Sequence, residues 1–184
     1  MTPHAKIPTG VDVHAPLATL HHAHGSILAQ MDALRGLPAL VEAMERARQV
    51  AAGTLLLFRG DVLQHHEDEE KALFPAVVAA AEPGPEREEV EAMVTRLRFE
   101  HHAIERAWQD LQPSLRLVAA GRAEHLDTSA VERLVDAYRA HAGLEEERFL
   151  PLAQAILGRD ARREEALGLE LHMRRLPDAG VGHI

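Results

Sequence analysis

Apolar positions along this chain recur at the spacing of amphipathic helices. Two histidines open the same pattern, with apolar residues 3, 7 and 10 positions later: Ile27, Met31 and Leu34 after His24, and Ile104, Trp108 and Leu111 after His101. These offsets fall on one face of an α-helix. The chain is therefore expected to contain two copies of a helix whose apolar face carries a histidine.

Turn signals divide the chain into four long helices and a short outer one. The first helix is expected to begin near Pro16 and to stop at Gly36-Leu37-Pro38. The others are expected at about residues 54–81, 86–120, 129–157 and 160–177, with Ser129 and Asp160 as caps and a kink at Pro75. This order predicts an all-α fold, an antiparallel four-helix bundle with a short additional C-terminal helix. We expect a flexible segment at 1–13, the bundle at 14–158, and an outer helix and tail at 159–184.

The motif His-x-x-x-Glu occurs on two of these helices, as His65 with Glu69 and as His141 with Glu145. Residues four apart stand one turn apart on the same helical face, so each copy places an imidazole beside a carboxylate. Each copy is followed by two apolar residues and a proline, and the histidine of the preceding helix stands 41 or 40 residues earlier. The chain is therefore interpreted as two repeats of a helix pair.

The repeat also chooses between neighbouring histidines. Counting back ten residues from the proline that ends each copy gives His141 in the second copy and His65 in the first. We therefore expect His65 to face inward and His66 to be a surface residue, although the apolar pattern alone allows either. His101 is preferred to His102, because an arginine one turn after His102 would place a cation where a metal is expected.

Imidazoles and carboxylates that face a helical core must be paired, because burying an unpartnered carboxylate costs several kcal/mol. A single His-x-x-x-Glu is a weak indication, since solvated charge on an exposed face is the common alternative. Two copies in register with two further histidines on apolar stripes favour a metal site. Mixed nitrogen and oxygen ligands suit an iron-type centre. The predicted ligands are His24, His65, Glu69, His101, His141 and Glu145.

Composition narrows the classes of function. The 184 residues suffice for one domain, and the apolar 46% is rich in alanine and leucine, which favours helices. A net charge of −9 argues against nucleic acid and membrane surfaces as partners. The absence of cysteine excludes disulfides, thiolate ligands and iron–sulfur clusters, and it fits a cytoplasmic protein.

The order of these residues resembles the hemerythrin-like (HHE cation-binding) domain family. The resemblance covers about residues 14–158 and includes the Leu-Phe-Pro and Phe-Leu-Pro that follow the two pairs. It implies a four-helix bundle holding two iron ions joined by an oxo or hydroxo bridge, with manganese or zinc as alternative metals. In that arrangement His24 and His65 would bind one iron, His101 and His141 the other, and Glu69 and Glu145 would bridge them.

Two positions depart from the oxygen-carrying members of that family. Where the carriers have a second histidine one turn along the third helix, this chain has Glu105, and where they have His-x-x-x-x-Asp, it has His141-x-x-x-Glu145. More carboxylate favours ferric iron, so reversible oxygen carriage is not expected. Two alternatives remain for Glu105: a carboxylate on or near the iron held by His101 and His141, or a surface residue paired with an arginine.

The resulting expectation is a cytoplasmic, non-haem di-iron protein that binds or reacts with oxygen, nitric oxide or peroxide. The alternative is a non-enzymatic iron or oxygen sensor, or an iron-binding protein, that acts through a protein partner. His21 stands one turn before His24, where it would line the site or hydrogen-bond to a ligand.

Overall fold

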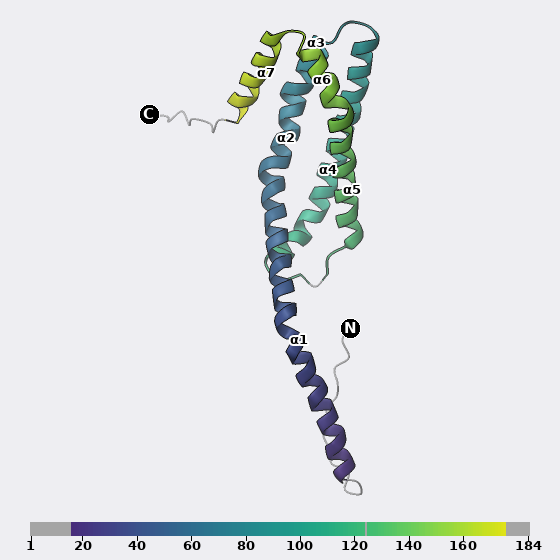
Figure 1. The fold of residues 1–184 in the computed structure, drawn as a ribbon, viewed down its shortest axis with the longest axis vertical. Coiled ribbons are helices and arrows are strands. Elements are labelled where there is room, and N and C mark those ends of the chain that lie inside the picture. Colours follow the sequence, from purple (N-terminus) through teal and green to yellow (C-terminus); the bar gives the residue numbers. More distant parts are fainter. Residues whose placement is uncertain (1–15, 124, 176–184) are drawn as a thin grey trace, which may run out of the picture. The chain divides into compact units, whose positions relative to one another are not determined.

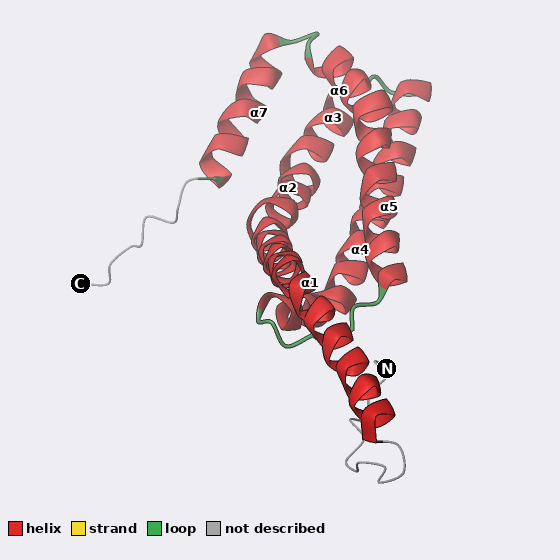
Figure 2. Ribbon diagram, turned by 60° about the horizontal axis from the view of Figure 1, so that its bottom comes forward, coloured by secondary structure: helices red, strands yellow, loops and turns green. Residues whose placement is uncertain are grey.

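The computed structural model describes the backbone of residues 16–123 and 125–175, and of these the side chains from residue 24 onward. The regular structure of these residues is helical throughout, without a strand, which confirms the all-α class (Figure 2). No described helix has the length and apolar character that a membrane crossing requires. The chain divides into two compact units, Met1–Gln49 and Val50–Ile184. The expected boundaries at residues 13 and 158 stay predictions.

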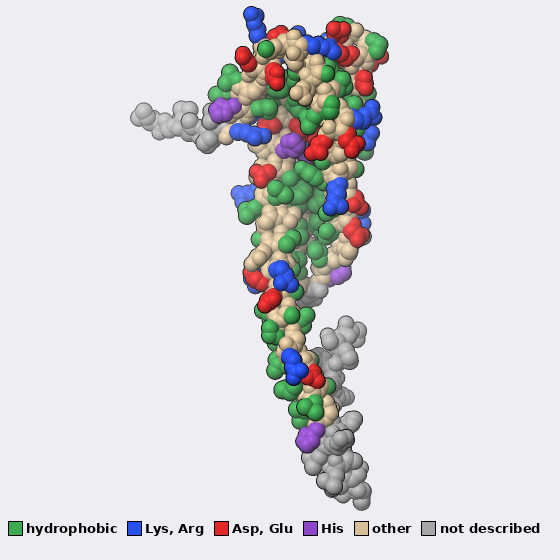
Figure 3. Space-filling view, in the orientation of Figure 1, with side chains coloured by type: hydrophobic (Ala, Val, Ile, Leu, Met, Phe, Trp, Pro, Cys, Tyr) green, Lys and Arg blue, Asp and Glu red, His purple; other side chains and the backbone are tan. Residues whose placement is uncertain are grey.

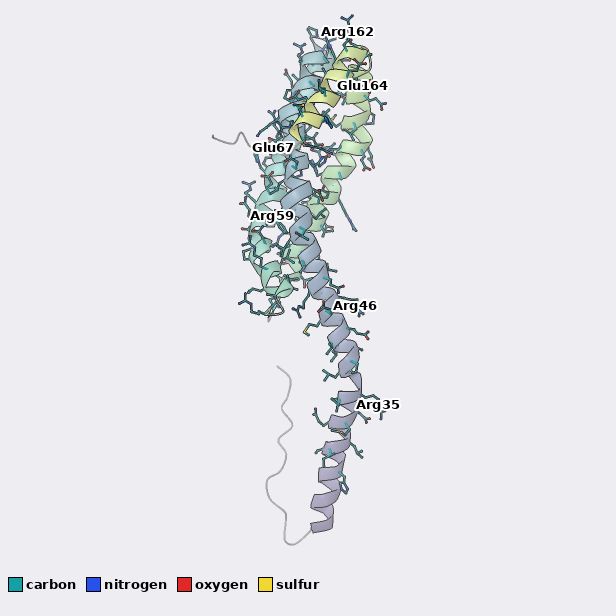
Figure 4. The ribbon with its side chains drawn as sticks, turned by 90° about the vertical axis from the view of Figure 1, so that its left-hand side faces the viewer. Arg35, Arg46, Arg59, Glu67, Arg162 and Glu164 are labelled. Carbon is teal, nitrogen blue, oxygen red and sulfur yellow. The ribbon has the colours of Figure 1, made fainter. Side chains whose placement is uncertain are left out.

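The first unit contains most of α1 (Pro16–Leu57), which runs through the predicted stop at Gly36-Leu37-Pro38 (Figure 1). The prediction of a helix end at this point is therefore wrong. Pro38 removes one backbone donor and frees the carbonyl four residues earlier, but the surrounding side chains are exposed and water can reach that carbonyl. Arg35 and Arg46 project from this helix (Figure 4).

The apolar stripe predicted after His24 is exposed in this unit. Its three members, Ile27, Met31 and Leu34, are each about half exposed, and apolar side chains are visible along α1 (Figure 3). The matching stripe after His101 is buried, as expected for a core face.

The second unit holds three antiparallel helical segments and an outer helix. From the end of α1, the first segment continues through η1 (Phe58–Val62), α2 (Leu63–Asp68), η2 (Glu69–Leu73) and α3 (Phe74–Ala80). The second is α4 (Pro85–Ala119), and the third is α5 (Thr128–Leu144), η3 (Glu145–Phe149) and α6 (Leu150–Leu157). The α4 helix packs against α5, and α3 packs against α4 and α6, in keeping with a hemerythrin-like bundle (Figure 1).

Two apolar clusters form the core of this unit. One contains Phe74, Leu97 and Phe149. The other contains Phe58 and Trp108, whose rings stack with centroids 4.1 Å apart. Full burial of one such large side chain contributes about 1.5–3 kcal/mol. On each helical segment the buried histidines and glutamates stand, along the chain, between residues of the two apolar clusters. These polar side chains are therefore held inside a packed bundle.

Both His-x-x-x-Glu copies pass into a π-turn at their glutamate. The η2 turn begins at Glu69 and the η3 turn at Glu145, and in each case the residue after the turn donates its N–H to the carbonyl of that glutamate. Proline lacks an N–H, and its ring crowds the carbonyl four residues earlier, so a wider turn ahead of Pro75 and Pro151 relieves both conflicts. The disturbance expected at Pro75 thus takes the form of a π-turn that begins at a candidate ligand.

Acidic residues cap two of the helices. Asp160 accepts a hydrogen bond from the backbone of Arg162 and caps α7 (Ala161–Arg174), as predicted. The α5 helix is capped by Asp127, which accepts hydrogen bonds from the backbone N–H and the hydroxyl of Ser129. The predicted cap, Ser129, is therefore wrong by two residues, because the carboxylate can accept both bonds at once.

The outer helix α7 is held by a buried carboxylate on α2. Asp68 accepts hydrogen bonds from Arg174 at 2.8 Å and from Arg175 at 3.2 Å, and it also accepts one from Gln64. Glu67, the neighbour of Asp68 on α2, lies beside the last turn of α7, where it forms an ion pair with Arg174 (Figure 4). Burial opposes ionisation of Asp68, but these hydrogen bonds outweigh burial and lower its pKa. The last turn of α7 is thereby anchored next to Glu69.

Candidate metal centre

Three helical segments bring ligating side chains together between the two apolar clusters. One set of mutually close ligand atoms comes from His66, His101 and His141, and a second comes from His101, His141, Glu69 and Glu145. Within each set the atoms all lie within 4.8 Å of one another. All five residues are buried, so the groups share one interior region.

The two glutamates face the histidines directly. Nε2 of His101 lies 3.4 Å from Oε2 of Glu69, and Nε2 of His141 lies 3.4 Å from Oε1 of Glu145. Four predicted ligands are therefore brought together.

The prediction that His66 is a surface residue is wrong. His66 is 1% exposed, whereas the side chain of His65 is 45% exposed. His66 stands four residues after Val62 and eight before Phe74, and both of these are buried, so its face of the helix is turned to the core. Nε2 of His65 lies 3.5 Å from a carboxylate oxygen of Glu69. His65 thus borders the cluster from its solvent side, while His66 lies inside it.

His24, His102 and Glu105 are not among these five buried residues. His24 is exposed on α1 within the first unit, and its role as a ligand stays a prediction. His102 is exposed on α4. The side chain of His21 lies outside the described residues. Glu105 contacts a buried histidine from the far side of the ring, and that histidine is His66, not His101 or His141.

Five buried atoms of the cluster have no hydrogen-bond partner. They are Nε2 of His66, His101 and His141, Oε2 of Glu69 and Oε1 of Glu145. In the part of the chain that the structure describes, only Nε of Arg87 shares this property. Leaving one buried polar group unsatisfied costs about 1–3 kcal/mol, so five together need a common partner. All five offer lone pairs, and a bound metal cation would satisfy them at once.

The opposite nitrogen of each buried histidine faces a carboxylate. Nδ1 of His101 lies 2.8 Å from Glu70, Nδ1 of His66 lies 3.3 Å from Glu105, and Nδ1 of His141 lies 3.4 Å from Glu100. Sequence reasoning missed Glu70 and Glu100. A signal existed for Glu70, which stands four residues after His66, whereas no spacing pointed to Glu100.

Crowding shifts the titration of one inner carboxyl group. Burial, followed by the charge and hydrogen bond of Glu69, raises the pKa of Glu145 to about 8. Glu145 therefore carries a proton at neutral pH in the metal-free protein. Tyr138, whose ring lies 6.2 Å from that of His141, also has a raised pKa, because it is partly buried and close to Glu145 and Glu69.

The pKa values of the three buried histidines shift in different directions. Burial and then the neighbouring His101 and His141 lower the pKa of His66 to about 3. Burial and His101 also lower the pKa of His141. For His101 burial opposes the charge, but the carboxylates of Glu69 and Glu70 outweigh it and raise the pKa. His66 and His141 are therefore neutral near pH 7, the form that binds a metal.

Metal affinity is expected to increase as the pH rises to about 8. Below that value Glu145 carries a proton that a metal must displace, and the raised pKa of His101 acts in the same direction. Each displaced proton gives about a tenfold change in affinity per pH unit. Titration with Co²⁺ at several pH values measures this slope. Glu145→Gln should flatten it, and an equally steep slope in that variant would contradict the assignment.

A comparison with known protein families agrees with this geometry. Residues 15–153 match the model of the hemerythrin HHE cation binding domain. Neither the curated proteins nor the solved structures contain a match to this chain. The matched range includes the whole cluster of buried histidines and glutamates and covers well over half of the chain. The chain therefore belongs to the hemerythrin HHE cation-binding domain family.

Proposed function

We propose that this chain is a cytoplasmic, non-haem di-iron protein that binds or reacts with oxygen, nitric oxide or peroxide. The observation that carries the proposal is the convergence of five buried, unpartnered ligand atoms, three nitrogens and two oxygens. Such a mixed set suits iron, and it exceeds what one tetrahedral ion takes. The ligands proposed from the geometry are His66, His101, His141, Glu69 and Glu145.

Two further ligands are proposed from the repeat. His65 is close enough to join from the solvent side, since its Nε2 lies 3.5 Å from Glu69 and 4.0 Å from Glu145. His24 would add a nitrogen from α1. The two glutamates, which stand on different segments and next to each other, would both hold the ions.

The protein's own residues define the surroundings of such a centre. Bound iron would supply exchangeable electrons and an open coordination position for a small ligand. Glu69 and Glu145 would balance part of its charge. Phe58 and Trp108 stack in the apolar cluster that comes next to these ligands along the helices, and they would limit the access of water. Tyr138 keeps its phenol proton because its pKa is raised, so it remains a hydrogen-bond donor near His141.

A metal sensor is the second candidate function. Asp68 is the neighbour of Glu69 in the chain, and it holds Arg174 and Arg175 of α7. A movement of Glu69 on metal binding would therefore occur next to the residue that anchors α7, a helix on the surface. A metal-dependent change in oligomeric state or partner binding, without turnover of peroxide, would favour this function.

Anaerobic loading with Fe²⁺ followed by oxidation tests the proposal. We expect two irons per chain and the near-ultraviolet absorption of a bridged diferric centre, because the ligand set is too large for one tetrahedral ion and suits a pair of ions. Peroxide consumption by the loaded protein then separates an enzyme from a sensor. The variant His102→Ala, at an exposed position on α4, should keep both irons. Binding of a single Zn²⁺, with no such absorption after iron loading, would rule out the di-iron centre.

A further inference from the structure

Two more His-x-x-x-Glu pairs have their histidines in the ligand cluster and their glutamates outside it, and the two pairs cross each other. His66 and Glu70 stand four apart on the first segment, and His101 and Glu105 stand four apart on α4. His66 contacts Glu105, while His101 contacts Glu70. Because the two segments run antiparallel, the histidine of each pair meets the glutamate of the other.

The crossing holds the two imidazoles in a defined arrangement. The rings of His66 and His101 stack with centroids 4.0 Å apart and planes 7° from parallel. Their Nδ1 atoms point to carboxylates at 3.3 and 2.8 Å, and their Nε2 atoms are the unpartnered atoms of the cluster. Each ring is thus bound on one edge and open on the other.

The third buried histidine repeats this arrangement with a different partner. Nδ1 of His141 faces Glu100 at 3.4 Å, and Arg96 donates to the other oxygen of that carboxylate at 2.8 Å. The three carboxylate side chains are between 22% and 31% exposed, so water reaches them, unlike the buried Glu145. All three pairs join neighbouring helical segments.

We propose that Glu70, Glu100 and Glu105 are positioning residues that orient the histidines of the metal centre. A neutral imidazole carries one N–H, and a carboxylate at Nδ1 accepts it, which leaves the lone pair of Nε2 free to face a metal. The anionic partner also makes Nε2 a stronger donor. Glu105 therefore acts through His66 and does not itself bind the metal. The metal part of this proposal rests on the proposed function.

The proposal is first tested on the metal-free protein, so that it can be judged whether or not iron binds. Long-range proton–nitrogen correlation spectra of protein labelled at histidine distinguish which ring nitrogen carries the proton. Recorded where the imidazoles are neutral, they should show the proton on Nδ1 of His66, His101 and His141. Glu70→Ala should change the signals of His101 most, and Glu105→Ala those of His66. The proton on Nε2 in the parent protein, or an exchanged assignment in the variants, would overturn the proposal.

Binding of Co²⁺ gives the second measurement, because its visible absorption reports the ligands. Loss of one outer carboxylate is expected to weaken affinity about 10–100-fold. Glu70→Gln keeps an acceptor oxygen and should recover most of the loss. Glu91→Ala, at an exposed glutamate of the same α4 helix that carries Glu100 and Glu105, is the matched control. Helix content measured by circular dichroism shows whether each variant is folded. If an alanine variant does not fold, the glutamine variant at the same position is used to measure affinity instead.

The possible outcomes separate this proposal from the proposed function. Affinity for Co²⁺ unchanged within about twofold in Glu70→Ala, Glu100→Ala and Glu105→Ala would overturn the positioning role. Normal proton placement on Nδ1 in a protein that binds neither Co²⁺ nor iron would overturn the di-iron function and leave the histidine–glutamate pairing intact. Loss of affinity in Glu70→Ala and its recovery in Glu70→Gln would support both.

Discussion

Replacing His66 with alanine is expected to abolish metal binding at the centre. His66 supplies one of three buried, unpartnered nitrogens, and it contacts the other two histidines through ring stacking and edge contacts. Loss of His66 should weaken metal affinity by more than the roughly 10–100-fold expected for the loss of one outer carboxylate. Iron content after anaerobic loading, measured by elemental analysis, is the direct test.

Two neighbouring variants sharpen this test. His65→Ala is expected to reduce affinity less, because that side chain is nearly half exposed and borders the cluster from outside. His102→Ala should have no effect, since His102 is exposed on the far face of α4. If His65→Ala removes the iron while His66→Ala retains it, the alignment of the two repeats describes the loaded site better than the geometry of the metal-free cluster does.

Metal should raise the melting temperature by on the order of 10 °C. A ligand at a thousand times its dissociation constant stabilises the folded state by about 4 kcal/mol. For a domain of this size, each kcal/mol shifts the midpoint by about 2–4 °C. The gain arises because the metal-free core holds five unsatisfied atoms and two adjacent carboxyl groups. Differential scanning calorimetry with and without metal, followed by a chelator, measures the shift and its reversal.

The rise in melting temperature on metal binding should depend on the two buried glutamates, Glu69 and Glu145. Glu145→Gln removes a ligand charge and keeps a neutral side chain at a position where the carboxyl group is itself protonated near pH 7. The metal-free form is therefore expected to be no less stable, while the metal-dependent gain becomes small. An unchanged gain in this variant would mean that metal binds elsewhere. His102→Ala should retain the full shift and serves as the control.

Much of the helical framework follows from local chemistry. The break at Glu82 to Gly84 and the loop before Asp127 separate segments whose apolar faces repeat at helical spacing, and the helix ends on either side of them agree with the predicted ones within a few residues. The stop predicted at Pro38 and the helix start predicted near residue 54 are wrong, because a proline in an exposed helix loses a hydrogen bond that water can replace. Local signals therefore located most breaks, but they did not reveal whether solvent reaches each one.

The sequence by itself determined the helical class and four members of the cluster: Glu69, His101, His141 and Glu145. These follow from residue type and spacing along single helices. The choice between His65 and His66 was decided only by the tertiary structure. Neighbouring residues differ by about 100° around a helix, and which face is inward depends on what the other segments present to it.

Tertiary structure also decided the roles of Glu70, Glu100 and Glu105. Each of them meets a histidine on a different segment, 31 to 41 residues away in the chain. The four His-x-x-x-Glu pairs look alike in sequence. Glu69 and Glu145 nevertheless face the cluster, while Glu70 and Glu105 contact the Nδ1 atoms on the opposite edge of the histidine rings. Helical spacing defines which side chains share a face, and only the packing of antiparallel helices defines which faces meet.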